Sequence, residues 1–325
     1  MEDILRRLLV TERYDSVSNF LSLYRMYMKS QKPLREVFDD YIPRTRPFRH
    51  TCVGLGLELL RRYSCLESRF PGVRKSMALL SCEESIKELQ AYVSLTQGPH
   101  HLLAPDKEHV LVGLPISLDG RRGLMIADPG YHIGRIITVM VDGNDPHTGW
   151  FNQTNEPDSI KDYCYAFSEV NNEYVIWHER VERETETKKQ VALIYATRQY
   201  CDGIQITEKR NLVYRLRSFV SRDYTGRVTA GIGFIIKANL NDLGFSLFYQ
   251  INRRRRKFKL RFKDFEDISN LDETTLNHIY LCNGQMQLPK GKLLSLIQQL
   301  SKVVADQAFT AQCLDINSHI CQLCI

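Results

Sequence analysis

The sequence predicts an α+β fold, in which helices come first, antiparallel strands follow and helices return at the end. Three observations lead to this prediction. Apolar residues recur at helical spacing over roughly the first 95 positions, at a spacing of two from His109 onward, and again at helical spacing beyond position 265. We therefore expect a helical domain over 1–95, an antiparallel β-barrel over 96–265 and a C-terminal helical segment over 266–325.

The composition is typical of a globular cytoplasmic protein. Of the 325 residues, 43% are hydrophobic and 25% are charged, and a net charge of +6 does not by itself require a nucleic-acid partner. Charged residues interrupt the first apolar run, which is not the pattern of a secretory signal, and no apolar stretch approaches the roughly 20 residues of a membrane span. The nine cysteines are odd in number and scattered, so we expect reduced thiols.

Helices are expected in the first part of the chain. Two apolar stripes lie before position 30, and a third short helix is expected from Val37 to Ile42. A further helix is expected over Ser85–Leu95, and Val73–Leu80 is interpreted as a strand. The stripes consist of Ile4, Leu5, Leu8 and Leu9, then Val17, Phe20, Leu21, Tyr24 and Met28.

Strands are expected in the middle of the chain. Asp119–Gly120 is a strong hairpin signal between the strands His109–Leu118 and Leu124–Asp128, and Pro115 favours a sheet edge or a bulge. Six or more strands at this spacing favour a barrel or a sandwich, and we predict the barrel. The other strands are expected at Arg135–Val141, Glu173–His178, Val191–Thr197, Asn211–Val220, Arg227–Ala238 and Phe245–Ile251, and the last helices at Leu271–Tyr280 and Lys290–Ala305.

Cys52 is the candidate nucleophile, carried by the N-terminal helical domain. A loop with Pro43 and Pro47 leads to Thr51, a plausible N-cap, and an apolar helical pattern continues to Tyr63. Cys52 then occupies the first helical position, where unpaired N–H groups and the helix dipole favour negative charge. A thiol so placed ionises readily, provided that a base and an orienting acid reach it.

His109 and Asp128 are the expected base and acid, carried by the barrel. If Asp119–Gly120 is a two-residue turn, Asp128 lies opposite Leu111, and His109 is two residues along the same strand. The imidazole and carboxylate are then diagonal neighbours, and docking the start of the Cys52 helix there completes a triad. Taken singly, the three residues have ordinary explanations as a buried apolar thiol, a strand end and a turn acid. Only their combination indicates catalysis.

The order of these features resembles the arylamine N-acetyltransferases and, more broadly, the transglutaminase-like and papain-like cysteine enzymes. Asp128-Pro129-Gly130-Tyr131 matches the family's Asp-x-Gly-aromatic sequence, and Glu108-His109-Val110-Leu111 is similar to the start of its histidine strand. The resemblance implies an N-terminal helical bundle, a barrel and a C-terminal α/β lid. It also implies ping-pong acyl transfer through a thioester on Cys52, from acetyl-CoA or another acyl-CoA that is not tightly bound, to a small amine.

One motif departs from that family. Its Arg-Gly-Gly-x-Cys sequence is replaced by Phe48-Arg49-His50-Thr51-Cys52, which has neither glycine. Two alternatives therefore stand beside acyl transfer. One is hydrolysis of an amide or peptide bond on the same fold, and the other is a degenerate, non-enzymatic relative that binds a polyanion.

Six further residues are candidates for binding substrate or cofactor. Two precede the cysteine, two follow the aspartate, and two lie in a polar loop that either covers a site or only fixes a connection. They are Arg49, His50, Tyr131, His132, Trp150 and Phe151. No metal site is expected, because the CxxC pair Cys321 and Cys324 has no second pair beside it.

A basic run near position 255 is a candidate polyanion site. It consists of Arg253, Arg254, Arg255, Arg256 and Lys257. Basic and apolar residues then alternate up to Lys263, which predicts an edge strand with one cationic face. Lysine and arginine also keep an edge strand from pairing with other chains, and this is the interpretation we favour.

Overall fold

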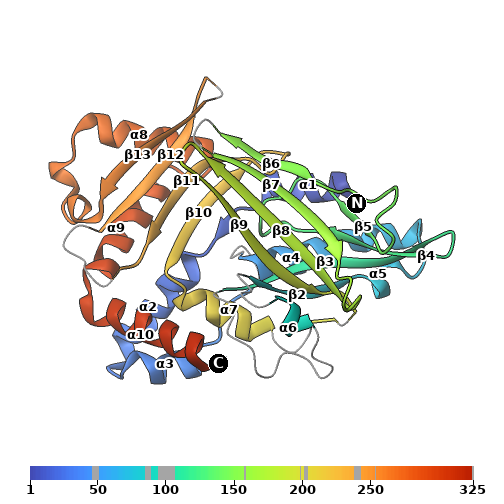
Figure 1. The fold of residues 1–325 in the computed structure, drawn as a ribbon. Helices are drawn as coiled ribbons and strands as arrows, with labels where there is room; N and C mark the ends of the chain where they lie inside the picture. Colours follow the sequence, from blue (N-terminus) through green and yellow to red (C-terminus); the bar gives the residue numbers. More distant parts are fainter. Residues whose placement is uncertain are drawn as a thin grey trace.

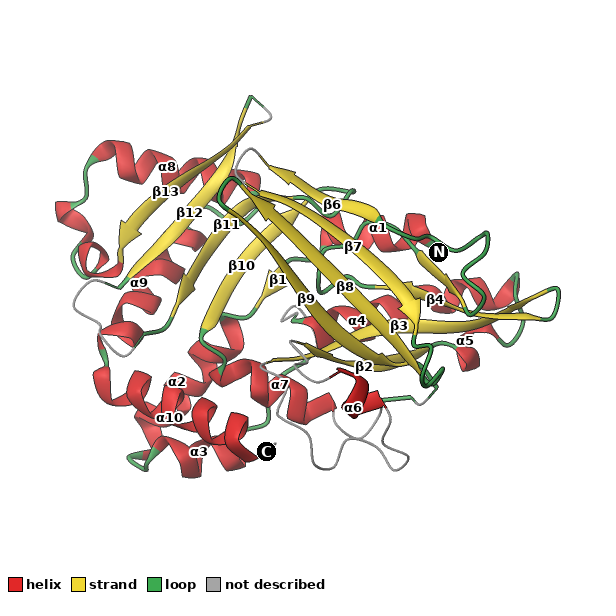
Figure 2. Cartoon of the chain, in the orientation of Figure 1, coloured by secondary structure: helices red, strands yellow, loops and turns green. Residues whose placement is uncertain are grey.

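The computed structural model describes residues 1–45, 51–84, 89–93, 107–156, 159–197, 199–200, 204–237, 243–252 and 254–323. Two antiparallel sheets with covering helices make up this part of the chain (Figure 1). Figure 2 shows the sheets side by side, with helices packed along the smaller one and beside the larger one. The predicted α+β class with antiparallel strands is confirmed.

Eight strands form the larger sheet: β2 (Ala78–Glu84), β3 (Lys107–Leu118), β4 (Arg121–Ala127), β5 (Ile137–Met140), β6 (Phe151–Glu156), β7 (Ser159–Phe167), β8 (Tyr174–Arg183) and β9 (Glu186–Tyr195). Their order is β5-β4-β3-β2-β9-β8-β7-β6. Strand β5, at one end of the sheet, contacts β7 near the other end, which shows that the sheet is curled. Apolar and aromatic side chains fill the curl, among them Tyr163, Tyr165 and Trp177.

The smaller sheet has five strands in the order β1-β10-β11-β12-β13. They are β1 (Tyr14–Asp15), β10 (Leu216–Arg222), β11 (Val228–Ile235), β12 (Gly244–Ile251) and β13 (Arg254–Arg261). The described strands of the barrel predicted over 96–265 form two antiparallel sheets, of which the larger is curled as a half-barrel, and the bounds of that domain stay a prediction. Between the two sheets in sequence lies helix α7 (Ile204–Val213), which separates β9 from β10 and occupies the start of the strand predicted from Asn211.

The other helices pack in more than one core. They are α1 (Glu2–Thr11), α2 (Ser18–Ser30), α3 (Leu34–Asp40), α4 (Cys52–Tyr63), α5 (Val73–Ser76), α6 (Leu89–Val93), α8 (Glu273–Gln285), α9 (Lys292–Ala305) and α10 (Gln307–Leu323). Helices α1 and α4 share a core with β2, β3 and β4. Helices α2, α3, α8, α9 and α10 share a core with the smaller sheet. The division of the chain into three domains and the lid role of the last segment stay predictions.

One local prediction differs from the structure just before β2. The segment Val73–Leu80 was expected as a strand, but Val73–Ser76 forms the helical turn α5, and β2 begins at Ala78. Gly72, at φ +89°, adopts the left-handed conformation that starts this turn. Three short 3₁₀ helices, Ser64–Ser68, Phe262–Phe265 and Ile268–Asn270, complete the described elements.

The hairpin β3–β4 has the predicted register. Asp119 and Gly120, with φ of 51° and 78°, form a two-residue turn of the type that suits twisted strands. Leu118 pairs with Arg121, and Val112 pairs with Ala127, so Asp128 follows directly at the end of β4. This register places the acid and the histidine strand side by side.

No helix within the described ranges combines the length and the apolar character needed to cross a membrane.

Candidate active site

Cys52 begins α4, as the sequence predicts, and lies where this helix meets β3. Its side chain is 4% exposed and contacts Val53 and Val110. Thr51 is the N-cap, but its hydroxyl caps no first-turn amide. Instead, the Thr51 hydroxyl donates a hydrogen bond to the buried carboxyl of Glu208 on α7. The start of α4, which carries the candidate nucleophile, is therefore tied to α7.

His109 and Asp128 form a buried hydrogen-bonded pair. The Nε2 atom of His109 lies 2.9 Å from Oδ2 of Asp128. The other carboxylate oxygen, Oδ1, accepts a hydrogen bond from the backbone N–H of Tyr131 at 2.9 Å. Asp128 is 0% exposed, so both oxygens are satisfied within the protein. The turn after β4 thus fixes the carboxylate, and the carboxylate fixes the imidazole.

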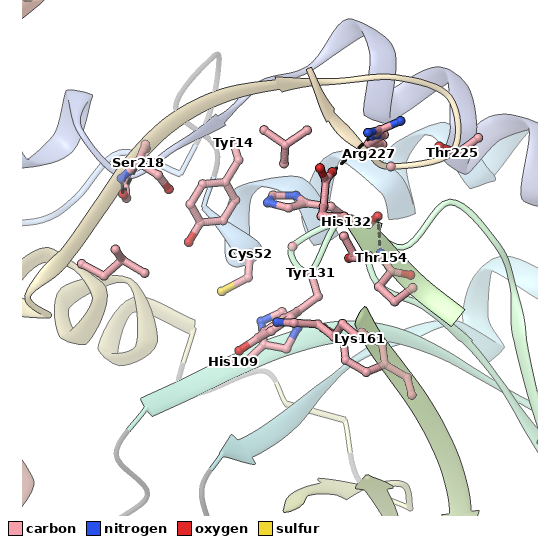
Figure 3. Close-up of a pocket in the computed structure, with 18 of the residues that line it drawn as sticks. Tyr14, Cys52, His109, Tyr131, His132, Thr154, Lys161, Ser218, Thr225 and Arg227 are labelled. Carbon is pink, nitrogen blue, oxygen red and sulfur yellow. Dashed lines mark hydrogen bonds and ion pairs between the residues drawn. The ribbon is translucent and has the colours of Figure 1, made fainter. Parts of the chain in front are cut away.

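Cys52 and His109 face each other in the pocket (Figure 3). Both side chains lie beside Gly130, and because Asp128 is bonded to Nε2, Nδ1 is the ring nitrogen that remains for the thiol. Burial alone would lower the pKa of His109, but the charge and hydrogen bond of Asp128, together with Cys52, raise this pKa to about 10. A raised pKa makes the imidazole a stronger base toward a proton donor beside it.

Gly130 permits this close approach. A Cβ atom at this position would lie 2.7 Å from Cε1 of His109 and 2.8 Å from Cβ of Cys52, distances that real side chains do not adopt. The next residue, Tyr131, packs its ring edge to face against His109, with ring centroids 4.8 Å apart. The sequence Asp128-Pro129-Gly130-Tyr131 therefore supplies an acid, room for the thiol and a wall for the imidazole.

The pocket above these groups has a volume of about 480 Å³ and draws on both sheets and on α7. Tyr131 and His132, two of the candidate binding residues, line it, and their role in binding stays a prediction. Two other candidates lie elsewhere. Phe151 is buried in the core of the larger sheet, and Trp150 is 53% exposed and stacks with the guanidinium of Arg180. Arg49 and His50 lie outside the described residues.

Four charged residues at the mouth of the pocket were not assigned to it from the sequence. Glu156 is 7% exposed and forms ion pairs with Arg227 at 3.3 Å and Arg255 at 3.6 Å. Lys161 lines the same region and pairs with Glu179 at 3.4 Å. Two arginines, Arg227 and Arg255, share the single carboxylate of Glu156, so the mouth of the pocket suits a ligand with negative charge.

The basic run lies on β13, the edge strand of the smaller sheet, as the alternation predicts. Arg255 lines the pocket, although it is exposed like Arg254, Arg256 and Lys257, and Arg253 lies outside the described residues. Binding of a polyanion at this edge stays a prediction. Among the residues that the structure describes, no three His, Cys, Asp or Glu side chains gather as metal ligands would.

Helix α7 carries two site residues that sequence reasoning missed, Glu208 and Asn211. They are one helical turn apart and face the start of α4. Glu208 accepts hydrogen bonds from Thr51 and, at 3.1 Å, from the side-chain amide of Asn19. The Asn211 amide nitrogen lies 3.6 Å from Sγ of Cys52. Polar residues at this spacing were the available signal, but the segment was interpreted as a loop and a strand.

Replacing Glu208 with glutamine is expected to make the free energy of unfolding less dependent on pH. Burial raises the pKa of Glu208 to about 7, against hydrogen bonds from Thr51 and Asn19 that lower it. Because the folded state holds this proton more tightly than the unfolded chain, the carboxyl stabilises the fold fully below about pH 4.5. That contribution is lost as the pH rises through about 7. From about pH 4.5 to pH 8, the free energy of unfolding of Glu208→Gln should gain roughly 3 kcal/mol relative to wild type.

Urea unfolding of the wild type and Glu208→Gln at both pH values measures this difference. Glu36→Gln is the matched control, because Glu36 is an exposed carboxyl on α3. A difference between wild type and Glu208→Gln that is independent of pH would contradict the assignment.

No protein-family model and no curated protein matches the sequence. Among solved structures, the chain is similar to a variant of an N-arylamine acetyltransferase from Mycobacterium smegmatis, at 9% identity over 92% of this chain and 90% of the other, with a TM-score of 0.42. It is also similar to the arylamine N-acetyltransferase from Mycobacterium abscessus, at 8% identity over 88% and 87%, with a TM-score of 0.38. These neighbours belong to the family that the sequence resembles.

Proposed function

We propose that the protein is a cysteine-dependent acyltransferase whose nucleophile is Cys52. The observation that carries this proposal is the position of the His109 imidazole, which lies beside Cys52 in the pocket and is hydrogen-bonded to the buried Asp128 carboxylate. A thiol, a base and an orienting acid in this order are the minimum set for nucleophilic catalysis by sulfur. The pocket gives a substrate access to the sulfur.

In the proposed mechanism, His109 takes the Cys52 proton and the sulfur attacks an acyl carbonyl. The backbone N–H of Cys52 lies in the first turn of α4, where it has no intrahelical acceptor, and it donates to the developing oxyanion. Collapse of the adduct expels the leaving group, which takes up a proton from the imidazolium. An amine then attacks the thioester with His109 as the base, while Asp128 holds the ring in the required tautomer.

Acetyl-CoA or another acyl-CoA is the donor that we propose. Coenzyme A carries phosphate groups, and the mouth of the pocket presents Arg227, Arg255 and Lys161. A guanidinium group can donate two parallel hydrogen bonds to one phosphate, which suits it to bind this ligand. The acceptor that we propose is a small amine, as in the family that the sequence resembles.

The test is incubation of the wild type with acetyl-CoA, with and without the arylamine aniline. We expect release of the coenzyme A thiol and an acetyl adduct that intact-mass spectrometry detects. Aniline should discharge this adduct and appear as acetylated product. Release of coenzyme A with acetate as the product, whether or not aniline is present, would assign hydrolysis instead. Absence of both adduct and coenzyme A release would contradict the proposed donor.

A further inference from the structure

Asn211 approaches the proposed nucleophile from the side of α7. Its side-chain nitrogen donates to Sγ of Cys52 at 3.6 Å, within the distance of a hydrogen bond to sulfur. The residue is 9% exposed and lines the pocket, so its amide lies at the boundary between protein and substrate. A primary amide has two N–H donors, and one of them can serve the sulfur while the other serves a second acceptor.

The position of Asn211 is fixed from two directions. Its backbone carbonyl accepts a hydrogen bond from the guanidinium of Arg217, which is 1% exposed and also binds the carbonyl of Leu212. One turn earlier, Glu208 is hydrogen-bonded to Thr51, the residue before the nucleophile. Both ends of this part of α7 are therefore tied to the site. Donors held in place before the reaction stabilise a transition state without the cost of reorganisation.

We propose that the Asn211 side-chain amide is a donor to the oxyanion that forms when Cys52 attacks an acyl group, an inference that rests on the proposed function. In the adduct, the new oxygen is two bonds from Sγ and can lie to one side of the line from Sγ to the Asn211 nitrogen. With these two atoms 3.6 Å apart, an oxygen in that position can be about 2.7–3.1 Å from the nitrogen, where such donors act. The backbone N–H of Cys52 supplies the other donor.

The attack of Cys52 needs no reactant besides the acyl donor. The sulfur electron pair forms the S–C bond, and the carbonyl π pair moves onto oxygen. Asn211 donates a hydrogen bond to that oxygen and transfers no proton. When the carbonyl reforms, the bond to the leaving group breaks and its electron pair departs with that group. Asn211 is thus a catalytic residue that acts during both acylation and deacylation.

Two probes of the same thiol separate this role from a structural one. Acylation by p-nitrophenyl acetate passes through an oxyanion, whereas alkylation by iodoacetamide displaces iodide at a saturated carbon and forms none. Loss of an oxyanion donor slows the oxyanion step by roughly 10²–10³-fold. For Asn211→Ala we therefore expect p-nitrophenyl acetate to acylate Cys52 at least about 10²-fold more slowly, while the alkylation rate stays within about threefold of wild type.

The second variant is Asn211→Ser, which keeps a hydrogen-bond donor and should recover part of the acylation rate. It serves as the test variant if Asn211→Ala folds poorly. Equal changes in the acylation and alkylation rates of Asn211→Ala, or no change in acylation, would overturn the inference and leave the proposed function intact. A wild-type protein that p-nitrophenyl acetate fails to acylate at Cys52 would overturn both.

Discussion

Replacing Cys52 with alanine is expected to reduce acyl transfer to the uncatalysed rate. The substitution removes the sulfur that carries the acyl group, and the methyl group of alanine fits beside Val53 and Val110 without new contacts. Because the thioester cannot form, His109 and Asp128 have no nucleophile to activate. The measurement is the steady-state rate of coenzyme A release from acetyl-CoA, together with the rate of alkylation by iodoacetamide near neutral pH.

The fast phase of alkylation should disappear in Cys52→Ala. Cys65→Ala is the matched control, because Cys65 is an exposed thiol on the 3₁₀ turn after α4. This control should lose only a slow alkylation and keep full turnover. Turnover or fast alkylation that persists in Cys52→Ala would refute the assignment of the nucleophile.

Replacing Asp128 with asparagine is expected to lower the rate of acyl transfer by about 10³–10⁴-fold while keeping the fold. The asparagine oxygen can still accept from the backbone N–H of Tyr131, which Oδ1 of Asp128 does now. Its amide group, however, donates to Nε2 of His109. The ring proton of the neutral imidazole then occupies Nδ1, the nitrogen that faces Cys52, and this tautomer cannot take the thiol proton.

The pH profile gives Asp128→Asn a second readout. The Asp128 charge raises the pKa of His109 against the effect of burial, so its removal should lower that pKa. The alkaline limb of the profile for coenzyme A release, where the imidazolium can no longer protonate the leaving group, should move to lower pH. Asp142→Asn is the control, because Asp142 is a surface carboxylate held by Arg121. A variant Asp128→Asn with the wild-type rate and profile would remove Asp128 from the mechanism.

The sequence predicted the half of the site that depends on local rules. A two-residue turn fixes the register of a hairpin, so the distance along the chain from His109 to Asp128 could be converted into proximity. An N-cap followed by an apolar helical pattern placed Cys52 at the first position of α4. These inferences depend only on residues that are close in the sequence or joined by a single turn. Local patterns of this kind are strong signals.

The half that was missed depends on packing between distant segments. Asn211 is 159 residues from Cys52, and its helix has little amphipathic character because it is buried against several elements. Arg255 was noticed as a member of a basic run, but its place at the pocket follows from the docking of the two sheets. The two sheets are likewise separated in sequence by α7, which the alternation of apolar residues did not reveal.

Peptide mapping of the wild type, quenched rapidly after mixing with p-nitrophenyl acetate, tests the central claim most directly. The arrangement of Cys52, His109 and Asp128 predicts that the acetyl group appears first on the peptide that contains Cys52 and is later discharged. An acetyl group that accumulates on the exposed Cys65 while Cys52 stays unmodified would contradict the account.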